Sequence, residues 1–507
     1  MFRGHKRHDN LKHMTEKLNH TKMPKPIIAV IPVLALITFL AIILTIFKSD
    51  SLNGGSQVAL LLASSICIAI AMAKYKVKWK AFEMQFQKTF GEVAITIIIL
   101  LAVGMLAGTW MISGVVPTLI YYGIQILSPN FFLISACIIA AFVSLLSGSS
   151  WTTIATIGVA LIGIGQALGI SEPWTAGAII SGAYFGDKMS PLSDTTILAS
   201  SAVKVDLFEH IKYMMFTTFP SFAISLVIFL IAGLCLGNTA EINVDEFLNG
   251  LDRKFNISIL TLIVPVFTAI LIAKKVPSLI TLFLSSLLAG VIAVFLQGDI
   301  LHEIADMPNK ELISTVKGLM TMIFGSTHIE MGDATLNELV ATRGMAGMLN
   351  TIWLIVCAMF FGSVMIASRM VESITTVIIR MAKSRTSLVG ATASTGIFLN
   401  VVTGDQFLSI MLTADIYNHA YKKRGFQPKL LSRTAEDSAT VTSVLIPWNT
   451  CGMTQAAVLG IPTLVYLPFC FFNIISPVMS VIIAKTGWNI QQNKMNDIHI
   501  YGNKEEK

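Results

Sequence analysis

One short segment of the sequence gathers several oxygen-bearing side chains between two apolar runs. Residues 186–196 read Gly-Asp-Lys-Met-Ser-Pro-Leu-Ser-Asp-Thr-Thr. Asp187 and Asp194 are seven residues apart, and Ser190 and Thr195 add hydroxyl groups beside them. Carboxylate and hydroxyl oxygens are hard ligands and suit hard cations. We therefore predict that this segment binds an alkali cation, with the two aspartates as the primary ligands.

The backbone of the same segment is expected to be unwound. Gly186 permits conformations that other residues avoid. Pro191 lacks an N–H donor and therefore frees a carbonyl four residues back, which would add another oxygen ligand. The alternative is an interfacial loop, in which Asp187 pairs with the neighbouring Lys188 or caps a helix.

A second polar cluster lies inside another apolar span. Residues 433–438 read Arg-Thr-Ala-Glu-Asp-Ser. Arg433 and Asp437 are four residues apart, the spacing at which side chains pair on one helix face. Glu436 is then left to bind a cation or a proton, and the alternative is a structural ion pair at the cytoplasmic edge. Further candidate members of this site are Ser438 and Asn449.

Two short polar segments interrupt other apolar runs, as Ser147-Gly148-Ser149-Ser150 and Thr403-Gly404-Asp405-Gln406. A helix that restarts after a break points N–H groups into a cavity, and one that ends there points carbonyls. We predict that Gly148 and Gly404 break the helices and that ligands come from Ser149, Ser150 and Asp405. The alternative is a tight turn outside the membrane.

The polar segments recur at a constant spacing. Gly148 and Gly404 are 256 positions apart, and so are Pro191 and Pro447. Polar interruptions at matching positions of two halves are the sequence sign of a transporter built from repeats. We therefore predict an internal repeat, and the sequence leaves open whether its two copies are inverted.

The elements that must position these residues are membrane-spanning helices. Of the 507 residues, 54% are hydrophobic and 13% are charged, whereas soluble domains carry roughly 25% charged residues. The apolar runs are about 20 residues long, which suits a helix rather than a strand of a membrane barrel. We predict an all-α polytopic membrane protein with about 10–13 transmembrane helices and two repeats that contain broken or re-entrant helices.

The charged loops predict the domain organisation. The segment 74–80 carries four lysines and follows the second apolar run. Positive loops stay inside, so this loop and the N-terminus are predicted to be cytoplasmic, in a multi-pass protein of the plasma membrane. The expected parts are a cytoplasmic basic tail (1–26), a first membrane half with one repeat (27–236), an external loop (237–256), a second membrane half (257–484) and a polar C-terminal tail (485–507).

The run Gly-Asp-x-x-Ser-Pro-x-Ser-Asp-x-Thr at 186–196 closely resembles the NhaC family of bacterial sodium/proton antiporters, within the ion-transporter superfamily. The stretches 403–405 and 436–450 look like its counterparts in the second half, and the likeness covers about residues 27–484. The resemblance implies secondary active transport that exchanges Na⁺ for H⁺. Because the family also includes a sodium-lactate/malate-proton exchanger, membership does not fix the substrate.

The expected mechanism is competition for shared carboxylates. A carboxylate that is buried away from water favours its protonated form, so it can hold a proton or Na⁺ but not both. Alternating access would present it to each side of the membrane in turn. Asp187, Asp194 and Asp405 are the expected Na⁺ ligands, with Na⁺ as the transported ion and no cofactor.

The main alternative is a Na⁺-coupled organic-acid exchanger on the same scaffold. The breaks at Gly148 and Gly404 would then cradle a carboxylate, and Arg433 would face it. The lack of other centrally placed Arg or Lys in the apolar spans argues against an anionic substrate. Li⁺ is a further candidate cation, and a homodimer is a candidate assembly.

Other classes fit less well, so the protein is expected to be a transporter rather than an enzyme, with no nucleic-acid partner. No Walker A motif is present. An intramembrane aspartyl protease would need glycine at Tyr184, and a serine protease at Gly148-x-Ser150 lacks an apolar-span histidine. An ion channel would show flux without exchange stoichiometry.

Overall fold

The structure is a computed structural model that describes residues 22–47, 54–236, 244–307 and 312–490. The described chain is almost entirely helical and has one isolated bridge, between Thr327 and Thr342. Nine of its helices are long and apolar enough to cross a membrane, or up to eleven if each of two bent helix pairs is one span. The chain is therefore an all-α polytopic membrane protein, as the composition predicts.

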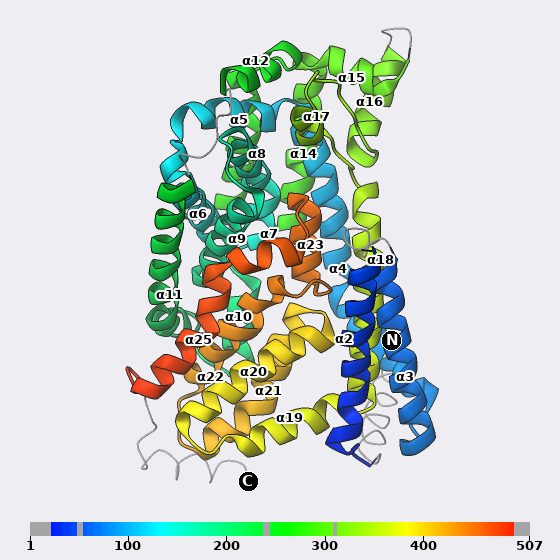
Figure 1. Ribbon diagram of the computed structural model, residues 1–507, viewed down its shortest axis with the longest axis vertical. Coiled ribbons are helices and arrows are strands. Elements are labelled where there is room, and N and C mark those ends of the chain that lie inside the picture. Colours follow the sequence, from blue (N-terminus) through cyan, green and yellow to red (C-terminus); the bar gives the residue numbers. More distant parts are fainter. Residues whose placement is uncertain (1–21, 48–53, 237–243, 308–311, 491–507) are drawn as a thin grey trace, which may run out of the picture.

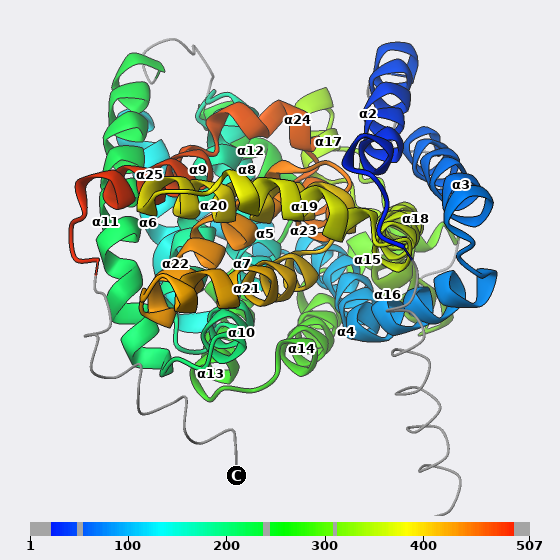
Figure 2. The same cartoon turned by 90° about the horizontal axis from the view of Figure 1, so that it is seen from below.

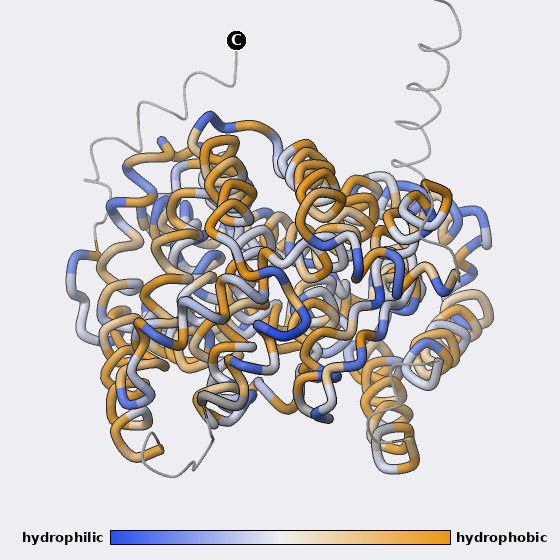
Figure 3. The backbone as a smooth tube through the Cα atoms, turned by 90° about the horizontal axis from the view of Figure 1, so that it is seen from above, coloured by the Kyte–Doolittle hydropathy of each residue, from blue (hydrophilic) through white to orange (hydrophobic). Residues whose placement is uncertain are grey.

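The exterior of the molecule is apolar, as a lipid-facing surface requires. Large hydrophobic side chains are widely exposed, among them Ile27 at 85% and Phe295 at 78%. Figure 3 shows hydrophobic helices at the rim and paler or hydrophilic segments through the middle. The polar residues that the sequence singles out thus lie inside a helical shell.

The shell is built from the helices that flank the broken segments. The N-terminal helices α2 (Pro26–Phe47) and α3 (Gly55–Tyr75) lie at one side beside α18 (Leu349–Ala367) (Figures 1 and 2). The other helices of the shell are α4 (Trp79–Ile112), α5 (Val115–Ile126), α11 (Leu207–Leu236), α12 (Val244–Lys254), α13 (Ile263–Ala273), α14 (Ser278–Leu296), α15 (Gly298–Ala305), α16 (Leu312–Phe324), α17 (Ala334–Val340), α19 (Met370–Met381), α24 (Thr463–Tyr466) and α25 (Phe471–Thr486).

The helix boundaries of the two repeats coincide at the spacing of 256. In the first repeat α6 spans Pro129–Ser147, and in the second α20 spans Arg385–Thr403. The next span, 150–167, contains α7 (Ser150–Thr153), a π-helical turn and α8 (Val159–Ala167), and it matches α21 (Gln406–Lys423). Each of these helices starts and ends at the matching residue of its counterpart.

The second half of each repeat follows the same rule. Helix α9 spans Glu172–Met189, and its counterpart runs from α22 (Pro428–Ala435) through a π-helical turn (Glu436–Thr440) to a 3₁₀ turn that ends at Leu445. Helices α10 (Asp194–Ala202) and α23 (Thr450–Leu459) then start 256 positions apart. The chain therefore contains the internal repeat that the polar segments predict.

The repeats also share their tertiary hydrogen bonds. The Ser144 hydroxyl donates to the Ala183 carbonyl (2.6 Å), and the Asn400 amide donates to the Ala439 carbonyl (2.7 Å). In Figure 1, α5 and α8 lie toward the upper end, whereas their counterparts α19 and α21 lie toward the lower end. Figure 2 places α19 and α21 at the lower face. The two copies therefore run in opposite directions, which the sequence alone leaves open.

The predicted outer segments are only partly described. Residues 1–21, 237–243 and 491–507 lie outside the described residues. Within the predicted external loop, 244–254 form α12, and α25 continues to Thr486, two residues into the predicted C-terminal tail. The assignments of tail, loop and side of the membrane stay predictions.

Candidate functional site

The first pair of helix breaks has the same geometry in both repeats. Gly148 and Gly404 have φ of 67° and 65°, in the left-handed region that glycine tolerates. Ser149 caps α7, because its hydroxyl accepts from the Thr152 N–H (3.2 Å). Asp405 caps α21, because its carboxylate accepts from the Leu408 N–H (2.9 Å). The predicted breaks are present, and each places a polar cap at the start of a helix inside the molecule.

The second break of each repeat lies against the first. A Cβ atom on Gly148 would lie 2.7 Å from the backbone of Leu192, between α9 and α10. In the other repeat the Thr450 N–H donates to the Gly404 carbonyl (2.8 Å). The breaks at Gly148 and Gly404 are thus each in contact with the segment that holds the matching proline, Pro191 or Pro447. Ser193 and Asn449 cap the helices that follow.

Gly186 does not unwind the chain, so that expectation is wrong. It lies within regular helix α9, where a Cβ atom would come 2.2 Å from the Ala141 carbonyl of α6. Its small size lets α9 and α6 approach closely. The carbonyl that Pro191 was expected to free belongs to Asp187, and it accepts a hydrogen bond from the Ser190 N–H (3.1 Å).

A cavity of about 80 Å³ lies at the crossing of the breaks. It brings together four of the predicted ligands: Ser149, Asp187, Asp194 and Thr195. The other lining residues are Thr96, Ile99, Val103, Gly148, Trp151, Thr152, Ser193, Ser278, Leu282, Gln406 and Phe407. The cavity combines carboxylates and hydroxyls with apolar walls, which is the donor set that an alkali cation requires.

Asp187 is the most enclosed acid of this cavity. It is 6% exposed, and its Oδ2 accepts from both the N–H (3.1 Å) and the hydroxyl (2.7 Å) of Ser150. Ser150 is therefore a partner of Asp187 across the break, as the predicted site needs. Asp194 is exposed to the cavity, whereas Ser190 is buried and its hydroxyl accepts from the Leu192 N–H.

Asp405 is not part of the cavity lining. It is 1% exposed, and its second oxygen lies 3.3 Å from the Thr450 hydroxyl, which donates to it. The neighbouring residue, Gln406, does line the cavity. Asp187 and Asp194 thus line the cavity and Asp405 does not, although all three were predicted as Na⁺ ligands.

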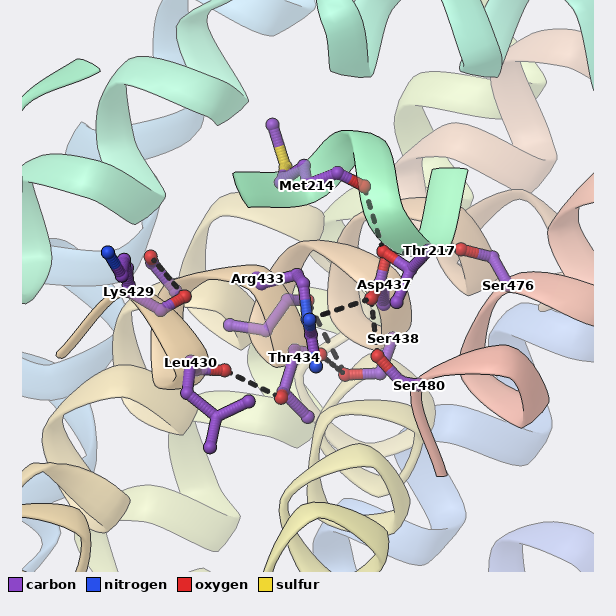
Figure 4. Close-up of polar contacts among 12 residues, drawn as sticks. Met214, Thr217, Lys429, Leu430, Arg433, Thr434, Asp437, Ser438, Ser476 and Ser480 are labelled. Carbon is purple, nitrogen blue, oxygen red and sulfur yellow. Dashed lines mark hydrogen bonds and ion pairs between the residues drawn. The ribbon is translucent and has the colours of Figure 1, made fainter. Parts of the chain in front are cut away.

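A second buried site surrounds Asp437 (Figure 4). Its carboxylate forms an ion pair with Lys188 and accepts from Thr217 (3.1 Å) and Ser476 (3.3 Å). Ser480 donates to its other oxygen. The predicted partner Arg433 lies 4.0 Å away, on the same helix face. Side chains from both repeats and from α11 and α25 therefore meet at one carboxylate.

Lys188 contradicts one alternative and one expectation from the sequence. It pairs with Asp437, 249 positions away, rather than with its neighbour Asp187. It is also 0% exposed and central, so Arg433 is not alone as a buried cation in the described chain. Its position between two apolar runs could have indicated this role, because a charge there is costly and usually functional.

Arg433 and Glu436 are buried with few partners. The Arg433 guanidinium lies 4.6 Å from the centre of the Tyr213 ring and makes no hydrogen bond within the described residues. Both carboxylate oxygens of Glu436 are likewise without a hydrogen-bond partner there, and the residue is 0% exposed. Glu436 opens a π-helical turn, a distortion that often marks functional sites.

The remaining predicted residues have structural contacts. The Ser438 hydroxyl donates to the Thr434 carbonyl of its own helix (2.6 Å). The Asn449 side chain donates to the Asn400 carbonyl (3.2 Å) and accepts from the Cys451 N–H (3.1 Å). Neither side chain lines the cavity. Ser438 bonds within its own helix, whereas Asn449 caps α23 after the break.

Comparison with known proteins agrees with this architecture. The profile of the Na⁺/H⁺ antiporter family matches residues 182–488. The chain is 39% identical to the Na⁺/H⁺ antiporter NhaC of Alkalihalophilus pseudofirmus over 391 residues. The aligned region covers 77% of this chain and 82% of that protein.

The names of two further relatives include solutes other than Na⁺ and H⁺. The Malate-2H⁺/Na⁺-lactate antiporter of Bacillus subtilis is 35% identical, over 79% of this chain and 83% of its own length. The arginine/ornithine antiporter ArcD of Halobacterium salinarum is 32% identical, over 91% of this chain and 92% of its own. On the family profile and these extents of identity, the chain belongs to the Na⁺/H⁺ antiporter family.

Proposed function

We propose that this protein exchanges Na⁺ for H⁺ across the plasma membrane by alternating access. The observation that carries the proposal is Asp187, a carboxylate at the crossing of two broken helices. Two donors from Ser150 hold it in place, and it lines a cavity that also contains Asp194. Intramembrane acids that line a cavity are typical of ion pathways.

The cavity supports a small cation as the substrate. Asp187, Asp194, Ser149 and Thr195 supply carboxylate and hydroxyl oxygens, and its volume of about 80 Å³ holds an ion with several waters. When Na⁺ leaves, a proton neutralises the buried carboxylate, because an isolated charge is costly away from water. One site therefore serves both ions in turn, and exchange follows from their competition.

Glu436 is the proposed second proton carrier. Its carboxylate is fully buried and lacks a hydrogen-bond partner in the described chain, whereas the neighbouring Asp437 is committed to Lys188 and three hydroxyls. An unpaired buried acid favours the neutral form. We therefore assign proton binding to Glu436 and a structural role to Asp437.

The proposed orientation places the lower end of Figure 1 in the cytoplasm. The basic segments 380–385 and 422–429 connect the helices α19 to α22 at that end. The acidic segment that includes α12 and α15 lies at the opposite end. The positive-inside rule then gives a cytoplasmic N-terminus.

Exchange of an organic acid is the second candidate, and the buried cations Lys188 and Arg433 are the observation in its favour. Both, however, face Asp437 rather than the cavity. A carboxylate substrate would meet Asp187 and Asp194 first, and like charges repel. We therefore place Na⁺/H⁺ exchange ahead of organic-acid exchange.

The experiment is a measurement of internal pH in proteoliposomes after addition of Na⁺, with Li⁺, malate and lactate tested in parallel. We expect Na⁺ alone to drive proton movement. D187N should abolish the response, and D415N, at an exposed aspartate on α21, should leave it intact. A response that requires malate or lactate would favour the organic-acid exchanger, and normal exchange by D187N would contradict the proposed site.

A further inference from the structure

The two repeats match in sequence position but differ in closure. Asp194 and Thr450 are matching residues, at the starts of α10 and α23. Asp194 is exposed to the cavity, whereas Thr450 is 1% exposed. Ser149 and Asp405 match as well. Ser149 is half-buried, whereas Asp405 is 1% exposed. The first repeat is therefore open at its breaks, and the second is closed.

Thr450 makes the contacts that close the second repeat. Its N–H donates to the Gly404 carbonyl (2.8 Å), and its hydroxyl donates to Asp405 (3.3 Å). These two bonds join the start of α23 to the break between α20 and α21. Among the hydrogen bonds of the described residues, none joins Asp194 to Gly148 or Ser149.

The helices beside the breaks show the same asymmetry. In the closed repeat α18 packs directly on the break: a Cβ atom on Gly404 would lie 2.8 Å from Ala358, and one on Gly362 would lie 2.8 Å from Thr403. Helix α4 holds the matching place in the first repeat, because residues 93–111 correspond to 349–367. There its side chains line the cavity.

We infer that Thr450 is a gate residue and that a second cavity opens at Asp405 in the other transport state. The inference rests on the proposed alternating access: inverted repeats reach the opposite-facing state when each copy adopts the arrangement of the other. The Thr450 contacts to Gly404 and Asp405 then break. Asp405 becomes accessible from the opposite side of the membrane.

A native cysteine reports this opening. Cys451 follows Thr450 and is 0% exposed, and its thiol lies 3.0 Å from the Gln406 side chain. Its matching residue in the first repeat is Thr195, which lines the present cavity. If the repeats exchange arrangements, Cys451 lines the second cavity and reacts with thiol reagents.

The test is labelling of a variant that retains only Cys451, with a membrane-impermeant maleimide applied from one face at a time. A T195C variant on a cysteine-free background gives the reference face. We expect Cys451 to label from the opposite face. T450V should raise that rate about five-fold, the effect of losing one net hydrogen bond, whereas T450S should not. A variant that retains only the buried Cys137 is the control for general loosening.

Two results would overturn the gate: labelling of Cys451 from the same face as T195C, or equal rates for T450V and T450S. The sidedness measurement uses intact Thr450, so it stands even if T450V does not fold. Na⁺-driven proton movement by the same single-cysteine protein is measured in parallel. Normal exchange with no sided labelling defeats the gate alone, and sided labelling without exchange defeats the proposed function alone.

Discussion

The ion pair between Lys188 and Asp437 predicts unequal costs for the removal of its two members. In K188M, Asp437 keeps three hydroxyl donors and Arg433 at 4.0 Å. In D437L, Lys188 keeps the Ser476 hydroxyl, at 3.3 Å, and the Phe472 ring, whereas Arg433 loses its ion partner. The second change leaves two buried cations without the carboxylate that pairs with both of them.

The expected magnitudes follow from this difference. Removal of one member of a buried pair that leaves uncompensated charge costs ~3–5 kcal/mol, and we expect D437L in this range. K188M leaves a carboxylate with hydrogen bonds and should cost ~1–3 kcal/mol. At about 2 °C per kcal/mol for a large chain, the melting temperature should fall by about 6–10 °C for D437L and about 2–6 °C for K188M.

Thermal unfolding followed by tryptophan fluorescence in detergent micelles measures both variants. The matched control is E83Q, which removes the partner of Lys80 in a pair whose side chains are 58% and 40% exposed. Such surface pairs contribute ~0–1 kcal/mol, so its melting temperature should barely change. A K188M protein that melts at or below the temperature of D437L would refute the reasoning.

Two further predictions concern the breaks. G148A should destabilise the protein by more than the ~1–2 kcal/mol of the left-handed conformation, because the added Cβ meets the Leu192 backbone. G425A has a similar φ of 71° and open space around it, so an equal loss of melting temperature in both would contradict the packing argument. D405N should keep the cap of α21 and an unchanged melting temperature, since Asn caps helices as well as Asp does. D405A should lose ~1 kcal/mol of stability. Exchange in proteoliposomes should be lost in D405N, because Asp405 is the carboxylate of the proposed second cavity, and retained exchange would exclude a role for its charge.

The helix breaks and the repeat could be predicted because their signals are local. Glycine beside small polar residues interrupts an apolar run, and the spacing of Gly148 and Gly404 recurs at Pro191 and Pro447. The direction of the repeats could not be predicted, because it depends on which end of each helix faces which side. The structure supplies that from the placement of α8 and α21.

The partners of the buried charged residues also could not be predicted from the sequence. Asp187 and Lys188 are neighbours, which suggests a local pair, but consecutive residues of a helix point in different directions. Asp187 faces the cavity and Lys188 faces Asp437 from the other repeat. The role of Gly186 could not be predicted for the same reason, since its close contact with α6 is set by packing between helices.

The most direct test of the account is the binding of radioactive Na⁺ to the purified protein as a function of pH. Competition for Asp187 predicts that Na⁺ binding weakens as the pH falls, that bound Na⁺ releases protons, and that D187N does not bind Na⁺. Binding that is independent of pH, or that persists in D187N, would contradict the claim that one buried carboxylate serves both ions.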